Sequence, residues 1–97
     1  MAVIEVATFR LAPGVDETEF IDADNRAQTE VVYHHRGLVR RTTARADGGG
    51  WLVVTMWGST ADADASAEAC RDDPASASWT ALLDPSSVTS ARYETLD

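Results

Sequence analysis

Residues 51–57, with the sequence WLVVTMW, are apolar at nearly every position. A run of β-branched and aromatic residues is typical of a β-strand. Successive side chains of a strand point to opposite faces, so a strand without polar alternation is covered on both faces. At 97 residues the chain lies at the lower end of single-domain lengths. The sequence therefore predicts one domain, residues 1–97, whose sheet needs cover on both sides.

The other elements follow from apolar periodicity and turn signals. Phe20, Ala23, Ala27 and Val31 recur at helical spacing, so a helix is predicted over residues 17–33, capped by Asp16. A second helix is expected after Ser59 or Thr60, and Asp73-Pro74 is typical of the start of a short third helix. Strands are predicted at residues 3–9, 38–46, 51–57 and 88–96, with a glycine turn at 47–50.

The order strand, helix, strand, strand, helices, strand is the split β-α-β pattern of the ferredoxin-like α+β class. It predicts a four-stranded antiparallel sheet with the helices on one face. Strands one and three are apolar on both faces, and the helices cover only one. A second copy of the chain, related by a two-fold axis, would cover the other face.

Three segments carry a resemblance to a known family. They are residues 9–14 (FRLAPG) before the acidic helix, residues 52–59 (LVVTMWGS) before the second helix, and residues 72–74 (DDP) opening a short aromatic helix. With these segments the chain resembles the antibiotic-biosynthesis-monooxygenase-like branch of the dimeric α+β barrel superfamily. The resemblance implies a homodimer whose sheets pack face to face, with a pocket between each sheet and its own helices.

The resemblance also bears on chemistry. Haem-degrading relatives use an Asn on the first strand, a Trp on the second helix and a His on the next helix. The corresponding positions here are Phe9, Ser66 and Ser78 or Trp79, so haem degradation is not expected. Oxygenase relatives that need no cofactor use an Asn, Trp, Tyr and Arg group, and the only Asn of this chain is Asn25, inside the first helix. That group is therefore not transferable as a whole.

Pairing strands two and three across the glycine turn places Thr55 opposite Thr42 and Trp57 opposite Arg40. Opposed residues share a face, so this face combines aromatic rings, hydroxyls and a guanidinium. We assign it to the pocket because Phe9 occupies the haem degraders' pocket position. Arg40 is the candidate catalytic residue, able to stabilise a substrate anion, and the candidate substrate-binding residues are Phe9, Thr42, Thr55, Trp57 and Trp79. The opposite face, with Ile4, Val6, Leu52, Val54 and Met56, is the predicted dimer face.

Structural roles compete with several of these assignments. Trp57 and Trp79 also suit core packing, and Arg40 suits an edge-strand ion pair. The alanine-rich second helix either leaves room for a ligand or approaches the sheet closely. His34 and His35 fit the end of a helix better than a metal pair, because adjacent helical residues point about 100° apart. Cys70, the single cysteine, fits a small buried residue.

Charge narrows the range of partners. The formal net charge is −8, from 8 Arg and no Lys against 16 Asp and Glu, which disfavours nucleic acids and anionic membranes. The acidic excess, including Asp24 and Asp64, is expected on the solvent faces of the helices, away from the arginines of strand two. We expect no signal peptide and no membrane span, hence a cytoplasmic protein. We also expect no metal, haem, nucleotide or other cofactor.

These observations favour a homodimeric, cofactor-independent monooxygenase-like protein that acts on a small aromatic or polyketide-type compound. A non-catalytic ligand-binding or accessory protein is the alternative, because the catalytic groups of both kinds of relative are absent. A polyketide-cyclase-like protein is a third reading, because it would need only a shaped pocket and a weak acid or base. The sequence does not decide whether the protein is an enzyme.

Overall fold

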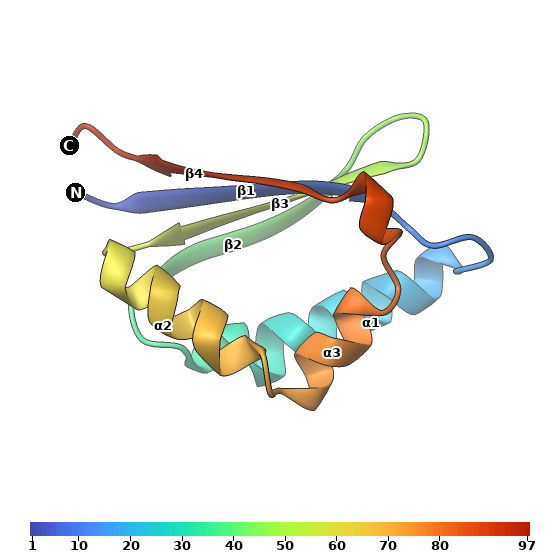
Figure 1. Ribbon diagram of the computed structural model, residues 1–97, viewed down its shortest axis with the longest axis horizontal. Coiled ribbons are helices and arrows are strands. Elements are labelled where there is room, and N and C mark those ends of the chain that lie inside the picture. Colours follow the sequence, from blue (N-terminus) through green and yellow to red (C-terminus); the bar gives the residue numbers. More distant parts are fainter.

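A computed structural model describes residues 1–97. The chain forms four strands and three α-helices, in the order strand, helix, strand, strand, helix, helix, strand (Figure 1). The strands are β1 (Val3–Arg10), β2 (Leu38–Arg45), β3 (Gly50–Trp57) and β4 (Thr89–Glu94). The helices are α1 (Glu17–Glu30), α2 (Thr60–Cys70) and α3 (Pro74–Thr80), with 3-10 turns η1 (Val32–His34) and η2 (Pro85–Ser87).

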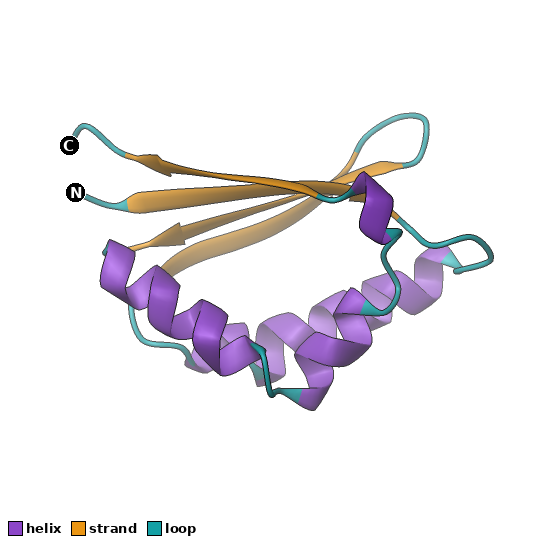
Figure 2. Ribbon diagram, viewed as in Figure 1, coloured by secondary structure: helices purple, strands orange, loops and turns teal.

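The strands form one antiparallel sheet in the order β2-β3-β1-β4. Figure 2 shows all three helices on the same side of this sheet, while the opposite side carries none. We call the helix-covered side the inner face and the other side the outer face. The predicted ferredoxin-like α+β arrangement, with helices on one face, is confirmed.

The helices begin where the sequence predicts. The side chain of Asp16 accepts a hydrogen bond from the Thr18 amide at 3.2 Å, and Asp73 accepts one from the Ala75 amide at 2.8 Å. Ser59 caps α2 in the same way. Each carboxylate or hydroxyl satisfies an amide that has no partner inside its helix, which fixes the starting residue.

The end of α1 was predicted too late. The α-helix stops at Glu30 rather than at residue 33, and the chain continues through a 3-10 turn. Val31 adopts φ −120° and ψ −72°, outside the helical region. It is followed by Val32, and consecutive β-branched residues crowd the preceding helical turn. Gly37 then turns the chain into β2 with φ of 84°, a backbone conformation that glycine adopts without steric cost.

Two clusters of buried side chains lie between the sheet and the helices. At one end, Phe9 and Trp51 of the sheet pack around Phe20 of α1, with Trp79 of α3 against them. We call these four side chains the aromatic cluster. At the other end, Val3 and Trp57 pack against Ala63 of α2. The middle of the inner face, between the two clusters, holds smaller and polar side chains.

The outer face is apolar and has no cover within one chain. Ile4, Val6, Leu52, Val54 and Met56 all alternate with inner-face residues in the strand register, and each is only partly buried. Tyr93 of β4 adds an exposed ring opposite Ile4. None of the helices combines the length and apolar character that a membrane crossing needs.

Candidate functional site

The strand register brings one residue from each strand into a polar row across the inner face. Arg41 of β2 pairs with Thr55 of β3, Thr55 pairs with Glu5 of β1, and Glu5 pairs with Arg92 of β4. Opposed residues of antiparallel strands share a face, so these four side chains all point toward the helices. The row separates the aromatic cluster from the Val3–Trp57–Ala63 cluster.

The predicted pairing of β2 with β3 is wrong by one residue. Thr55 lies opposite Arg41 and Val54 lies opposite Thr42. The backbone amide of Ala46 donates to the Gly50 oxygen at 2.8 Å, which leaves a three-residue loop, residues 47–49, instead of the expected four. A change of one residue in a hairpin loop moves every side chain of the strand to the other face.

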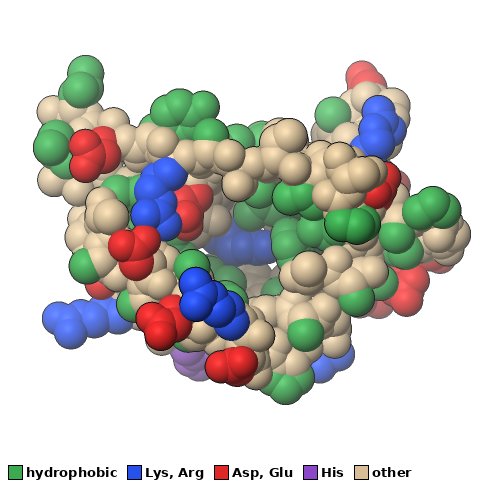
Figure 3. All heavy atoms as spheres, viewed as in Figure 1, with side chains coloured by type: hydrophobic (Ala, Val, Ile, Leu, Met, Phe, Trp, Pro, Cys, Tyr) green, Lys and Arg blue, Asp and Glu red, His purple; other side chains and the backbone are tan.

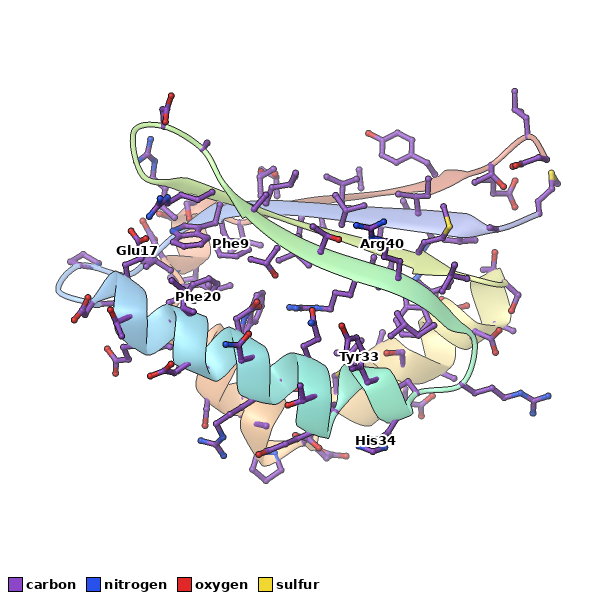
Figure 4. All side chains as sticks on the ribbon, turned by 180° about the vertical axis from the view of Figure 1, so that it is seen from behind. Phe9, Glu17, Phe20, Tyr33, His34 and Arg40 are labelled. Atoms are coloured by element: carbon purple, nitrogen blue, oxygen red, sulfur yellow. The ribbon has the colours of Figure 1, made fainter.

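Arg40 and Thr42 consequently lie on the outer face and do not belong to the pocket. There they line a small recess of about 200 Å³ with Ile4, Val54 and Met56, and the Arg40 Nε donates to the Thr42 hydroxyl at 3.2 Å. Figure 4 shows Arg40 on the side of β2 away from the helices. The inner-face residues of β2 are instead Arg41 and Thr43, which are partly buried while Arg40 and Thr42 are exposed.

A hollow of about 480 Å³ lies against the polar row, on the side of β1 and β4. Figure 3 shows it as an opening between the sheet and the helices, with acidic and basic side chains gathered along one side. The side chains of Ala7 and Val53, which face each other on β1 and β3, leave this space because they are short. The residues that line the hollow are Glu5, Val6, Ala7, Val53, Thr55, Ser90, Ala91 and Arg92.

Charged groups hold one side of the hollow in place. Arg92 donates from Nε and Nη2 to one carboxylate oxygen of Glu5, at 3.2 and 2.9 Å, and from Nη1 to Asp64 of α2 at 2.7 Å. The other Glu5 oxygen accepts from the indole Nε1 of Trp57 at 2.7 Å. Hydrogen bonds to Asp64 and then Glu5 raise the pKa of Arg92 above its ordinary value. The guanidinium therefore remains positively charged at any pH at which the protein would be studied.

A second network, beneath the polar row, is buried. Arg41 Nη2 donates to Oδ1 of Asp24 at 2.8 Å, and the two side chains are 6% and 11% exposed. The same Asp24 oxygen accepts from the indole of Trp79 at 2.9 Å. The expectation that Asp24 lies on a solvent face is wrong, as is the expected separation of acidic residues from the arginines of β2. Asp24 is one turn after Phe20 on the buried side of α1, directly below Arg41.

The remaining predicted substrate-binding residues fall in different places. Thr55 lines the hollow. Trp57 is buried and reaches the hollow through its hydrogen bond to Glu5. Phe9 and Trp79 belong to the aromatic cluster, with ring centroids 5.3 Å apart, and neither lines the hollow. Figure 4 shows Phe9 and Phe20 facing each other between the sheet and α1. Whether Phe9, Trp57 or Trp79 contacts a ligand stays a prediction.

The histidines and the cysteine lie apart from the hollow. His34 is exposed and points away from the sheet (Figure 4). Nδ1 of His35 lies 2.6 Å from the hydroxyl of Ser66, a contact that ties the end of the 3-10 turn to α2. Cys70 is a free thiol at the end of α2. No three His, Cys, Asp or Glu side chains lie close enough together to hold a metal ion.

The polar side chains of the hollow other than Glu5 can all donate hydrogen bonds. A guanidinium has five N–H donors, and three of those of Arg92 are used. The hydroxyls of Thr55 and Ser90 make no hydrogen bond to another protein group. The hollow can thus donate to a ligand from three side chains on β3 and β4. This arrangement suits a ligand whose polar edge consists of carbonyl, enolate, phenolate or carboxylate oxygens.

Sequence reasoning missed Glu5 and Arg92 as the charged groups of the site. Arg92 of β4 lies opposite Glu5 of β1 in the sheet, 87 residues away in the chain. A signal was present, since Glu5 is the only charged residue of the strand predicted at residues 3–9 and Arg92 is the only basic residue of the last strand. Opposite charges on strands expected to pair are a cue that could have joined them.

The fold is the α+β fold of antibiotic-biosynthesis-monooxygenase-like proteins. An asparagine-to-alanine variant of SnoaB, a cofactor-independent oxygenase from Streptomyces nogalater, superposes with a TM-score of 0.82 at 15% identity, over 99% of this chain and 94% of that one. A candidate antibiotic biosynthesis monooxygenase from Caulobacter crescentus gives 0.78 at 14% identity, over 99% and 91%. Rv0793 from Mycobacterium tuberculosis gives 0.72 at 19% identity, over 100% and 97%.

These similarities establish the fold alone, because sequence identities this low do not carry a function from one protein to another. The sequence matches no model of a known protein family. No curated protein matches it either. Function therefore has to be argued from the residues of the hollow.

Proposed function

We propose that this protein is a cofactor-independent monooxygenase that oxidises a small aromatic or polyketide-type compound in the hollow between sheet and helices. The observation that carries the proposal is the donor-rich lining of a cavity of about 480 Å³ with apolar walls, Ala7 and Val53. Cavities of this size and mixed character hold small organic ligands. SnoaB, which shares the fold at full length, is a cofactor-independent oxygenase.

The proposed reaction takes its electrons from the substrate. A ring CH₂ next to a carbonyl loses a proton, and the resulting enolate transfers its electrons to dioxygen as a carbon–oxygen bond forms. The peroxide anion formed takes back the proton removed in the first step to give the hydroperoxide R₂CH–OOH. This hydroperoxide loses water to leave a new carbonyl. One oxygen atom enters the product and the other leaves as water, so R₂CH₂ and O₂ give R₂C=O and H₂O without any other reductant.

The residues of the hollow have separate roles in this scheme. Arg92, Thr55 and Ser90 donate to the substrate oxygen on which negative charge develops, and such preorganised donors stabilise the transition state. Glu5 is the one carboxylate that lines the hollow, so we assign it as the acceptor of the ring proton. Ala7 and Val53 provide the flat apolar surface against which a ring can lie.

Filling the hollow is expected to abolish oxidation. Ala7→Leu places a larger side chain on the floor of the hollow and so displaces the substrate. A displacement of about 1 Å can lower the rate about a hundredfold. Oxygen consumption with anthrone as substrate measures the effect, with product followed by absorbance. Ala67→Leu, the same change on the solvent side of α2, is the control and should retain activity.

Two results would contradict this function. If Ala7→Leu consumed oxygen as fast as Ala67→Leu, the reaction would occur elsewhere. If the unmodified protein bound anthrone-like ligands but consumed no oxygen across a panel of electron-rich phenols and ketones, the chain would be a ligand-binding or accessory protein instead. We also propose a cytoplasmic location, which is supported by the free thiol of Cys70, because free thiols persist in reducing compartments.

We further propose that two copies pack through their outer faces. The support is the uncovered apolar surface of β1 and β3, which alternates with inner-face residues that are already packed. A sheet of this type normally exposes polar residues on its open side. Ile4, Val54 and Met56 would lie in the centre of such an interface, with Arg40 and Thr42 beside them.

A charge in the centre of this face is expected to separate the copies. Light scattering should give about twice the chain mass of 10.4 kDa for the unmodified protein. Val54→Asp should give a mass near that of a single chain, because it buries a carboxylate without a partner at the interface. Glu19→Asp on the exposed first turn of α1 is the control. A single-chain mass for the unmodified protein at micromolar concentration would disprove the dimer.

A further inference from the structure

Asp64 of α2 binds the guanidinium of Arg92, which lines the hollow. Arg92 lies on the edge strand β4, and its Nη1 crosses the opening to Asp64 on α2 at 2.7 Å. Asp64 is 63% exposed, in contrast to the buried Asp24. No other basic side chain contacts Asp64, and α2 is otherwise anchored to the sheet through Ala63, which packs against Val3 and Trp57.

The two carboxylates bound to Arg92 differ in how firmly they are held. Glu5 accepts from Arg92 and from Trp57, and its strand is central in the sheet. Asp64 accepts only from Arg92, on the surface of a helix. Exposed ion pairs of this kind contribute little to stability and exchange readily. A ligand oxygen can therefore take the place of Asp64 without disturbing Glu5.

We infer that Asp64 is a specificity-determining residue, a built-in competitor that a ligand replaces on Arg92 with an ionised oxygen of its own. A carboxylate, phenolate or enolate ligand restores the charge pair that Asp64 gives up. A neutral ligand of the same shape leaves Arg92 with one anionic partner fewer. The inference rests on the proposed role of the hollow as a ligand site, and it names anionic aromatic compounds as the class the hollow selects.

The test measures binding with two unreactive probes, 2-naphthoate and the neutral 2-naphthamide. Titration is followed by the indole N–H resonance of Trp57, which is bonded to Glu5 beside the hollow. The unmodified protein should bind naphthoate more tightly than naphthamide, by about threefold. Asp64→Asn should tighten naphthoate binding by a further factor of about three and change naphthamide binding much less. Arg92→Gln should remove the preference.

Asp22→Asn is the matched control, since it makes the same change in net charge at an exposed position of α1. The inference is overturned if Asp64→Asn and Asp22→Asn affect naphthoate binding equally, or if the two probes bind with equal affinity to the unmodified protein. In both cases the hollow remains a ligand site and the proposed function stands. If neither probe moves the Trp57 resonance, both the inference and the ligand site are wrong.

Discussion

Replacing Phe20 with alanine is expected to lower the free energy of unfolding by about 3–5 kcal/mol, the range for removal of a buried aromatic ring. Phe20 is 0% exposed and is surrounded by aromatic rings. Its centroid lies 5.6 Å from Phe9, 4.8 Å from Trp51 and 6.0 Å from Trp79. These contacts join α1 and α3 to the sheet, so the loss would be a large part of the stability of a small domain.

Equilibrium unfolding in urea measures this loss, followed by tryptophan fluorescence. Ile21→Ala is the control, because the adjacent side chain is 41% exposed and its truncation should cost less than about 1 kcal/mol. If the two substitutions lowered stability equally, the aromatic cluster would not be the main link between α1 and the sheet.

Breaking the buried ion pair is expected to have a comparable effect. Arg41→Met removes the cation that neutralises Asp24 and leaves a carboxylate that is 11% exposed with the Trp79 indole as its remaining partner. Loss of one partner of a buried pair costs about 3–5 kcal/mol, because the other charge stays buried without compensation. The double variant Arg41→Met, Asp24→Leu should recover part of this loss, since no charge is then left behind.

The control is a second ion pair of α1, Arg26–Glu30, in which the side chains are 65% and 56% exposed. Arg26→Met should change the free energy of unfolding by about 0.5 kcal/mol or less. Urea unfolding of these three variants and of the unmodified protein gives the comparison directly. If Arg41→Met lowered the free energy of unfolding no more than Arg26→Met, the Asp24 carboxylate would have to be hydrated in the variant. The Arg41–Asp24 pair would then not be required for stability.

The elements that the sequence predicts well are those with local causes. The β-branched run at residues 51–57, the cap at Asp16 and the Asp73-Pro74 helix start each depend on neighbours within a few residues. Each was confirmed, together with the order of elements and hence the fold. The end of α1 was predicted three residues too late, because the apolar spacing continues through Val31 while the consecutive β-branched residues Val31 and Val32 end the helix.

The site was predicted less well because it depends on register. The apolar content of β1 and β3 identified both faces of the sheet, and Thr55 was placed correctly on the inner one. Arg40 was chosen instead of Arg41 because the loop 47–49 is one residue shorter than assumed. Hairpin loop length is a small local difference, yet it decides which of two adjacent arginines faces the helices.

By itself, then, the sequence determined the α+β fold, the placement of helices on one face and the apolar character of the other, because the spacing of apolar residues indicates which surfaces avoid water. Only the tertiary structure decided which charged groups meet. Glu5 and Arg92 are brought together by the pairing of the first and last strands, and Asp24 and Arg41 by the packing of α1 under β2. Charged side chains carry no periodic signal that names a distant partner, so their pairing depends on which strands and helices pack together.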